Sequence, residues 1–205
     1  MKLRILVGLT VLLALAGCGD STGPTATPLA EVSSYHPIPD QPLGPATQTI
    51  DQAAGGTWSY AKPAAGKLTL VYFGYTSCPD VCPTTMADLA AAMTRLPGSL
   101  ASKVWVQFVS TDPHRDTAAR LSRWIDSYSA TFHAGRAPIE QVVAAARSYA
   151  IAITPPKVTK HDYEVTHGAQ VLVLDQHGGE VGFFSELAGA KAYAEALPTL
   201  IKDYA

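Results

Sequence analysis

The 205-residue sequence has only three cysteines, no internal repeat and no block of basic residues. Its formal net charge of −2 makes nucleic acid an improbable partner, because nucleic-acid binding relies on clustered positive charge. The apolar run at residues 5–16 is shorter than the roughly 20 residues that a membrane-spanning helix needs. Three cysteines are an odd count for an exported protein, so one of them is expected to have a separate role.

The first 17 residues are predicted to be the signal peptide of a lipoprotein. Lys2 and Arg4 precede the apolar run, as in secretory signals. Residues 15–18, Leu-Ala-Gly-Cys, resemble a bacterial lipobox, in which Cys18 becomes the lipidated first residue; an ordinary signal peptide with an unrelated cysteine is the alternative. We therefore expect an exported protein with a lipid anchor on the outer face of the bacterial cytoplasmic membrane. Without Lys2 and Arg4, 13 basic residues face 17 acidic ones, a net charge of −4.

Residues 18–45 are predicted to be a tether between the membrane and a domain formed by residues 46–205. Serine, threonine and six prolines dominate the tether, and such a composition cannot form a core. The remaining 160 residues suffice for one domain with a substantial core.

The domain is predicted to alternate strands and helices in an α/β plan. Strands are expected at residues 47–51, 57–60, 68–73, 104–109, 171–174 and 181–184, the first two and the last two of them as hairpins. Helices are expected at residues 83–96, from a cap at Asp116 or Thr117 to 128, from Pro138 onward and at 190–201.

Two thiols separated by four positions follow the buried strand at residues 68–73. The sequence there is Cys-Pro-Asp-Val-Cys-Pro, residues 78–83, with Pro79 expected in the first helical turn. If the helix begins near Cys78, Cys78 and Cys82 lie on one face, about 6 Å apart along the axis. That separation allows either chelation of one soft metal ion or a Cys78–Cys82 disulfide. Asp80 is interpreted as a surface or partner-facing residue.

The element order resembles a thioredoxin fold with an extra N-terminal β-hairpin and an inserted helical segment. That fold usually has a cis-proline before the strand at 171–174, where this chain has His167 and no proline. Two thiolates and one imidazole form a donor set that suits copper, whereas structural zinc usually takes a fourth ligand. His161 is the main rival for the third position. The other four histidines are interpreted as surface or structural residues: His36 in the tether, His133 in an expected loop, His177 in a hairpin turn and His114 before a helix.

Three segments carry a resemblance to the Sco/SenC family of membrane-anchored copper proteins. They are residues 72–83, Tyr-Phe-Gly-Tyr-Thr-Ser-Cys-Pro-Asp-Val-Cys-Pro; residues 108–117, Phe-Val-Ser-Thr-Asp-Pro-His-Arg-Asp-Thr; and residues 163–167, Tyr-Glu-Val-Thr-His. The resemblance implies that Cys78, Cys82 and His167 bind one copper ion per chain. It also implies a role in assembling the copper centre of a respiratory cytochrome oxidase. The expected partners are the copper-bearing oxidase subunit and another copper chaperone or a thiol reductant.

Two modes of action follow from the resemblance, copper transfer as a metallochaperone and reduction of target cysteines by the Cys78–Cys82 dithiol. The family often has aspartate before the distal histidine and serine or threonine after it, where this chain has Thr166 and Gly168. Loss of that carboxylate affects how the imidazole is oriented. The alternatives are a thiol–disulfide oxidoreductase or peroxiredoxin-like enzyme without a physiological metal, and a protein with an inert disulfide.

Overall fold

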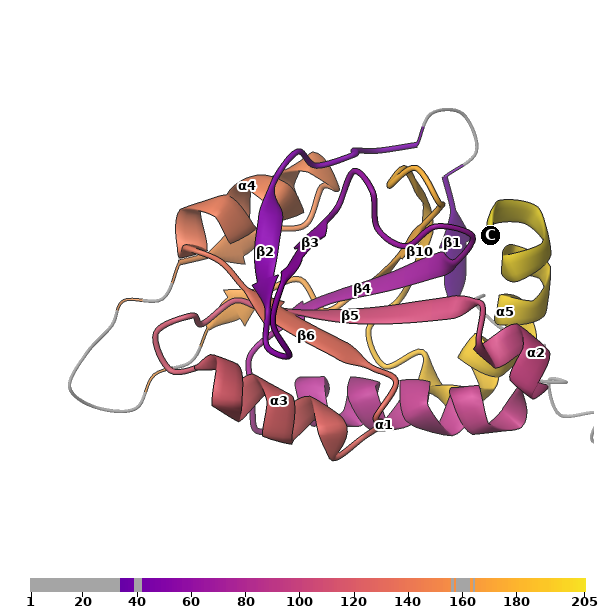
Figure 1. Cartoon of the computed structure of the whole chain (residues 1–205), viewed down its shortest axis with the longest axis horizontal. Coiled ribbons are helices and arrows are strands. Elements are labelled where there is room, and N and C mark those ends of the chain that lie inside the picture. Colours follow the sequence, from indigo (N-terminus) through magenta and orange to yellow (C-terminus); the bar gives the residue numbers. More distant parts are fainter. Residues whose placement is uncertain (1–33, 39–41, 156, 158–162, 164) are drawn as a thin grey trace, which may run out of the picture. The chain divides into compact units, whose positions relative to one another are not determined.

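The computed structural model describes residues 34–38, 42–155, 157, 163 and 165–205, and the following account concerns these residues (Figure 1). The strands are β1 (Tyr35–Pro37), β2 (Thr49–Gln52), β3 (Thr57–Ser59), β4 (Leu68–Gly74), β5 (Val104–Ser110), β6 (His133–Arg136), β7 (Ile153–Thr154), β8 (Thr166–His167), β9 (Val171–Leu174) and β10 (Glu180–Phe184). The helices are α1 (Val81–Arg95), α2 (Gly98–Ala101), α3 (Ala118–Asp126), α4 (Ile139–Ser148) and α5 (Gly189–Tyr204). Within the described residues, no helix has both the length and the apolar character that a bilayer crossing requires.

Eight strands form one sheet in the order β1-β10-β9-β4-β5-β6-β2-β3. The three strands β4, β5 and β6 are parallel, whereas β9 runs antiparallel to β4 and β10 antiparallel to β9. A separate two-stranded sheet joins β7 to β8. Every residue of β4 is buried, as expected for a central strand that is covered on both faces.

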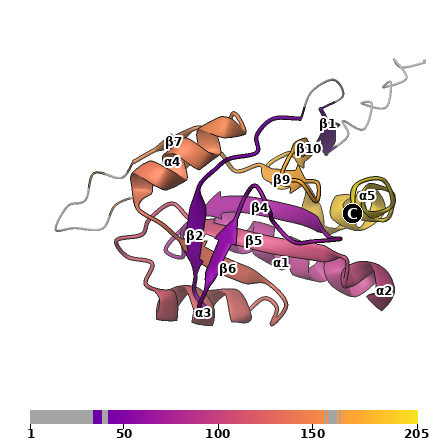
Figure 2. The same ribbon diagram turned by 45° about the horizontal axis from the view of Figure 1, so that its top comes forward.

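Helices cover the two faces of the large sheet, with α1 and α3 on one side and α4 on the other (Figures 1 and 2). Because successive strand residues point to opposite faces, Leu70 and Tyr72 join a core with α1, α3 and α5, while Val71 and Phe73 join a second core with α4. The carboxyl ends of β4 and β5 lead into α1 and into the turn before α3, so the edge they share is where a site is expected.

The predicted α/β fold is confirmed, and the predicted strands and helices are present with small shifts of their ends. Thr117 caps α3 by accepting a hydrogen bond from the Arg120 amide, at 3.3 Å. Strand β6 was not predicted from the sequence, and placing His133 in a loop was wrong. His133 opens β6, and its ring stacks on Trp105 with ring centroids 3.4 Å apart. Strand β6 is short and contains a glycine, so its sequence has no strand periodicity.

The predicted boundary between tether and domain also needs correction, because part of residues 18–45 is folded. Strand β1 pairs with β10, and Leu43 forms an isolated bridge with Glu180. His36, assigned to the tether, stacks on Phe183 within this pairing. The signal peptide, Cys18 and the tether up to residue 33 lie outside the described residues, so the lipoprotein interpretation stays a prediction.

Candidate metal centre

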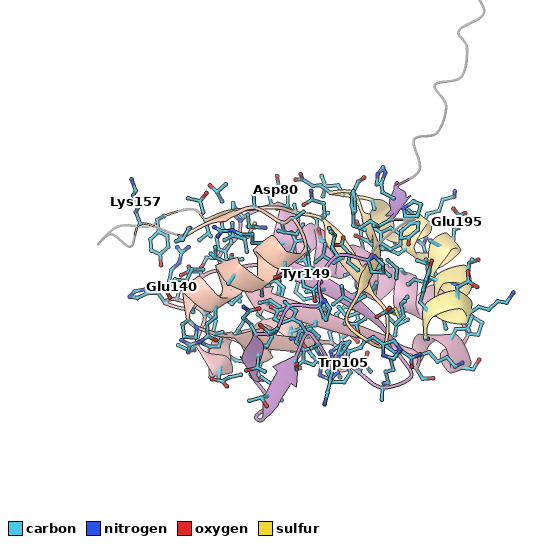
Figure 3. The ribbon with its side chains drawn as sticks, turned by 90° about the horizontal axis from the view of Figure 1, so that it is seen from above. Asp80, Trp105, Glu140, Tyr149, Lys157 and Glu195 are labelled. Atoms are coloured by element: carbon cyan, nitrogen blue, oxygen red, sulfur yellow. The ribbon has the colours of Figure 1, made fainter. Side chains whose placement is uncertain are left out.

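The loop between β4 and α1 carries the two thiols. Helix α1 begins at Val81, so Cys78 and Pro79 precede it, and the expectation that Pro79 lies in the first helical turn is wrong. The Cys78 amide instead donates a hydrogen bond to the Tyr75 carbonyl, at 3.1 Å, in a turn that ends three residues before the helix begins. Asp80 is exposed, as predicted, and its side chain makes no capping hydrogen bond. Figure 3 labels Asp80 at one margin of the domain and Trp105 at the opposite margin.

Cys82 lies in the first turn of α1 and is fully buried, whereas Cys78 is partly exposed. The end of β4 approaches Cys82 closely, since a Cβ atom added to Gly74 would lie 2.9 Å from its Sγ atom. Glycine is therefore required there for steric reasons. The Tyr72 hydroxyl donates to Cys82 Sγ at 3.7 Å from the same strand.

His167 reaches the dithiol from β8, which pairs with β7 through His167 and Ile153. Its Nδ1 atom lies 3.0 Å from the Gly168 carbonyl oxygen, and because a carbonyl only accepts, Nδ1 carries the proton in this contact. The lone pair of Nε2 is then available, 3.6 Å from Cys82 Sγ. The Gly168 carbonyl thus orients the imidazole in this chain, in which Thr166 stands where the family often has aspartate.

The three potential donor atoms, from Cys78, Cys82 and His167, all lie within 4.8 Å of one another. The hydrogen bond from Cys82 lowers the pKa of Cys78 to about 5, helped by backbone amides and His167 and opposed by burial. The same hydrogen bond and burial raise the pKa of Cys82. Cys78 is therefore an accessible thiolate near neutral pH, and Cys82 is a buried thiol until a metal or a disulfide replaces its proton.

The other histidines are not part of this group where the structure describes them. His114 and His177 are exposed, and His36 and His133 lie in β1 and β6. His161 lies outside the described residues, so its exclusion as a ligand stays a prediction.

Several residues at the site were not identified from the sequence. The rings of Tyr72 and Tyr75 meet His167 edge to face at 6.0 and 5.8 Å. Asp112 and Arg115 contact Tyr163, four residues before His167, whereas from the sequence their segment was only a helix start and part of the family resemblance. The available signal was two aspartates and an arginine within five residues, directly after a central strand.

Together, the fold and the site define a thioredoxin-like domain with a Cys-Cys-His group at the carboxyl edge of its central strands. The family model described as SCO1/SenC matches residues 43–202, which is most of the chain. The chain therefore belongs to the SCO1/SenC family, as the sequence resemblance predicted.

Relatives and solved structures agree with this assignment. The chain is 27% identical over 143 residues to the mitochondrial Protein SCO1 homolog 1 of Arabidopsis thaliana, covering 70% of this chain and 43% of the plant protein. It is 29% identical over 136 residues to the bovine mitochondrial Protein SCO2 homolog, covering 64% of this chain and 50% of that protein. The match therefore spans about half the length of these curated relatives.

Two bacterial structures are similar over nearly their whole length. Bradyrhizobium japonicum ScoI with copper bound has a TM-score of 0.66 and 28% identity, covering 77% of this chain and 98% of that one. The solution structures of apo Sco1 from Thermus thermophilus give a TM-score of 0.69 and 26% identity, covering 82% and 96%.

Proposed function

We propose that this protein binds copper through Cys78, Cys82 and His167 and assists assembly of the copper centre of a respiratory cytochrome oxidase. The observation that carries the proposal is the convergence of two sulfurs and one imidazole nitrogen within 4.8 Å in a chain of the SCO1/SenC family. Thiolates suit Cu(I) and imidazole suits Cu(II), so this donor set accommodates both oxidation states. The copper-bound relative supports the choice of metal.

The difference in exposure between the thiols indicates how copper would be handed on. Cys78 lies at the surface edge of the loop, where an incoming ligand of a partner can approach, and Cys82 is buried against Gly74 and Tyr72. Ligand exchange would begin at Cys78, while Cys82 and His167 hold the ion until the partner has bound it. The copper-bearing oxidase subunit is the recipient in this proposal.

Reduction of target cysteines is a second candidate function, favoured by the lowered pKa of Cys78. A partly exposed thiolate beside a buried second thiol can attack a disulfide, after which Cys82 resolves the mixed disulfide. Two electrons pass to the target, and the Cys78–Cys82 disulfide forms. The same dithiol serves both roles.

We also propose that Cys18 carries the lipid anchor, so that residues 34–205 act at the outer face of a bacterial cytoplasmic membrane. The basic and apolar start of the sequence and the lipobox-like residues 15–18 support this assignment. Cys18→Ala is expected to release the protein from membranes and leave copper binding unchanged. Retention of Cys18→Ala in the membrane after an alkaline wash would contradict the anchor.

The decisive experiment is copper stoichiometry and absorption of the reduced protein without its first 33 residues. We expect one copper ion per chain after dialysis against a weak competitor, and sulfur-to-Cu(II) charge-transfer bands for the oxidised ion. A protein that retains no copper but still reduces a small disulfide would support the reductase and overturn the copper role.

A further inference from the structure

The β5–α3 turn, defined as the end of β5, the connection and the first residues of α3 (residues 110–120), contacts both parts of the candidate metal centre. Its polar residues Ser110, Thr111, Asp112 and Asp116 are fully buried, which is unusual for a connection at the edge of a sheet. A buried polar group needs a hydrogen-bond partner. Ser110 finds its partners within the turn, whereas Thr111, Asp112 and Asp116 bond to the two segments that carry the donors.

On the dithiol side, Asp116 holds the loop that leads to Cys78. Its carboxylate accepts hydrogen bonds from the Thr76 amide at 3.2 Å and from the Thr76 hydroxyl at 2.5 Å. Arg120, from the first turn of α3, donates to the Thr76 hydroxyl at 2.6 Å and to the Ser77 hydroxyl at 3.0 Å. The two residues directly before Cys78 are therefore fixed to the start of α3.

On the histidine side, Arg115 and Asp112 hold Tyr163 by its backbone, its ring and its hydroxyl. Arg115 Nη2 donates to the Tyr163 carbonyl at 2.8 Å, and the guanidinium carbon lies 3.8 Å from the centroid of the tyrosine ring. The Tyr163 hydroxyl donates to Asp112 Oδ1 at 2.9 Å, and Arg115 Nε donates to Asp112 Oδ2. These contacts act four residues before His167.

The histidine segment needs such support because its own secondary structure is short. Strand β8 has two residues, and among the described residues its pairing partner is the two-residue β7. The Arg115 guanidinium also lies 5.6 Å from the Tyr75 ring centroid, and that ring contacts His167. Arg115 therefore contacts both the dithiol loop and the segment that leads to the imidazole.

We propose that Arg115 and Asp116 are paired positioning residues, Arg115 for His167 and Asp116 for Cys78. The β5–α3 turn then fixes the spacing between imidazole and dithiol, although neither residue touches the metal. The copper measurements below rest on the proposed function, whereas the measurements on metal-free protein do not.

The first test uses reduced, metal-free protein and two readouts, one for each donor segment. Amide hydrogen exchange of Gly168, which donates to the Ala152 carbonyl at 2.8 Å, reports on the histidine side. The rate of Cys78 alkylation by iodoacetamide reports on the dithiol side. Arg115→Lys keeps the charge but not the planar fork, so we expect about tenfold faster Gly168 exchange and Cys78 alkylation within about twofold of the parent.

Asp116→Asn is expected to show the reverse pattern, a changed Cys78 alkylation rate and unchanged Gly168 exchange. Tyr163→Phe removes only the hydroxyl bond to Asp112 and should speed Gly168 exchange less than Arg115→Lys does. This second variant keeps the test valid if Arg115→Lys does not fold. Arg123→Lys, at an exposed arginine of α3, is the matched control and should change neither readout.

In the copper arm, Cu(II) and Cu(I) affinities are measured separately with competing chelators. Arg115→Lys should weaken Cu(II) binding by about 10–100-fold, the usual cost of losing an outer-shell partner, and change Cu(I) binding by less than about threefold. Unchanged Gly168 exchange in both Arg115→Lys and Tyr163→Phe would overturn the proposal, as would an equal change of both readouts in every variant. If the parent protein binds no copper, the proposed function fails and the metal-free readouts still decide the positioning roles.

Discussion

The dithiol loop and the histidine segment meet at one site, but the fold holds them in different ways. Cys82 lies in the first turn of a 15-residue helix, one loop after the buried strand β4, so the hydrophobic core determines its position. His167 lies 85 residues further along the chain, in a two-residue strand beside an equally short one. Hydrogen bonds of a few polar side chains determine its position instead. We therefore expect dithiol changes to affect all chemistry at the site, and histidine-side changes to affect only one oxidation state of copper.

The largest expected effect tests the dithiol side. Cys82→Ser, or Cys78→Ser, should abolish copper retention in both oxidation states, because a hydroxyl is a hard ligand that stays protonated at neutral pH. Copper content after dialysis against a competing chelator measures this. Cys18→Ser is the matched control and should retain one copper ion per chain. Full copper retention by either dithiol variant would show that the sulfurs are not ligands.

His167→Ala tests the histidine side. It should weaken Cu(II) binding at least about 100-fold, which is the upper end of the cost of changing a residue outside the ligand set. Cu(I) binding should weaken far less. Two thiolates satisfy linear Cu(I), so the reduction potential of the site should rise. Separate Cu(II) and Cu(I) titrations check this, and dithiol exchange with a small disulfide should persist. His114→Ala and His161→Ala are the comparisons. If His161→Ala removes the charge-transfer bands and His167→Ala does not, the third ligand is misassigned.

The same contrast explains what the sequence could predict. The β4–loop–α1 unit is continuous in sequence, so a buried run followed by the Cys-Pro-Asp-Val-Cys-Pro motif indicated both the fold and the dithiol. His167 could not be derived from spacing alone, since a pairing 85 residues away leaves no periodic pattern; the family resemblance selected it. Arg115 and Asp116 were visible only as a helix start and as part of a family motif, and their positioning role was not, because hydrogen-bond partners such as Tyr163 and Thr76 depend on the folded chain.

The errors in the fold have a related cause. Strands β1 and β6 are short and contain proline or glycine, so their place in the sheet depends on pairing with β10 and β5. Pro79 lies before α1 and not in its first turn, because the chain first forms the Tyr75–Cys78 turn and the helix begins only at Val81.

A third prediction separates the two thiols by their pH dependence. Because the pKa of Cys78 is lowered to about 5 and that of Cys82 is raised, alkylation of the reduced, metal-free protein should modify Cys78 first. The fraction of reactive thiolate should rise through pH 5 and stay constant above about pH 6, whereas an ordinary thiol gains reactivity up to pH 9. Cys82→Ala removes the hydrogen bond that mainly lowers the pKa of Cys78. The pH profile of Cys78 alkylation should therefore shift toward higher pH, and the alkylation rate at pH 6 should fall several-fold. Mass spectrometry of the labelled protein measures both sites, and equal labelling of the two cysteines at pH 6 would contradict the asymmetry.

The smallest expected effect concerns Glu180, a buried carboxyl group that belongs to neither part of the site. It opens β10, is only 1% exposed, and burial raises the pKa of its carboxyl from 4.5 to about 7. Folding therefore favours the protonated form. Its contribution to stability is full below pH 4.5 and is lost as the pH rises through 7. Glu180→Gln keeps the shape of the side chain but cannot ionise. The free energy of unfolding of the parent should fall between pH 5 and pH 8, and in Glu180→Gln this fall should be smaller by about 2 kcal/mol. Urea unfolding of the metal-free protein measures this, with Glu195→Gln on the exposed face of α5 as the control. An unchanged pH dependence in Glu180→Gln would remove Glu180 as a separate titrating group.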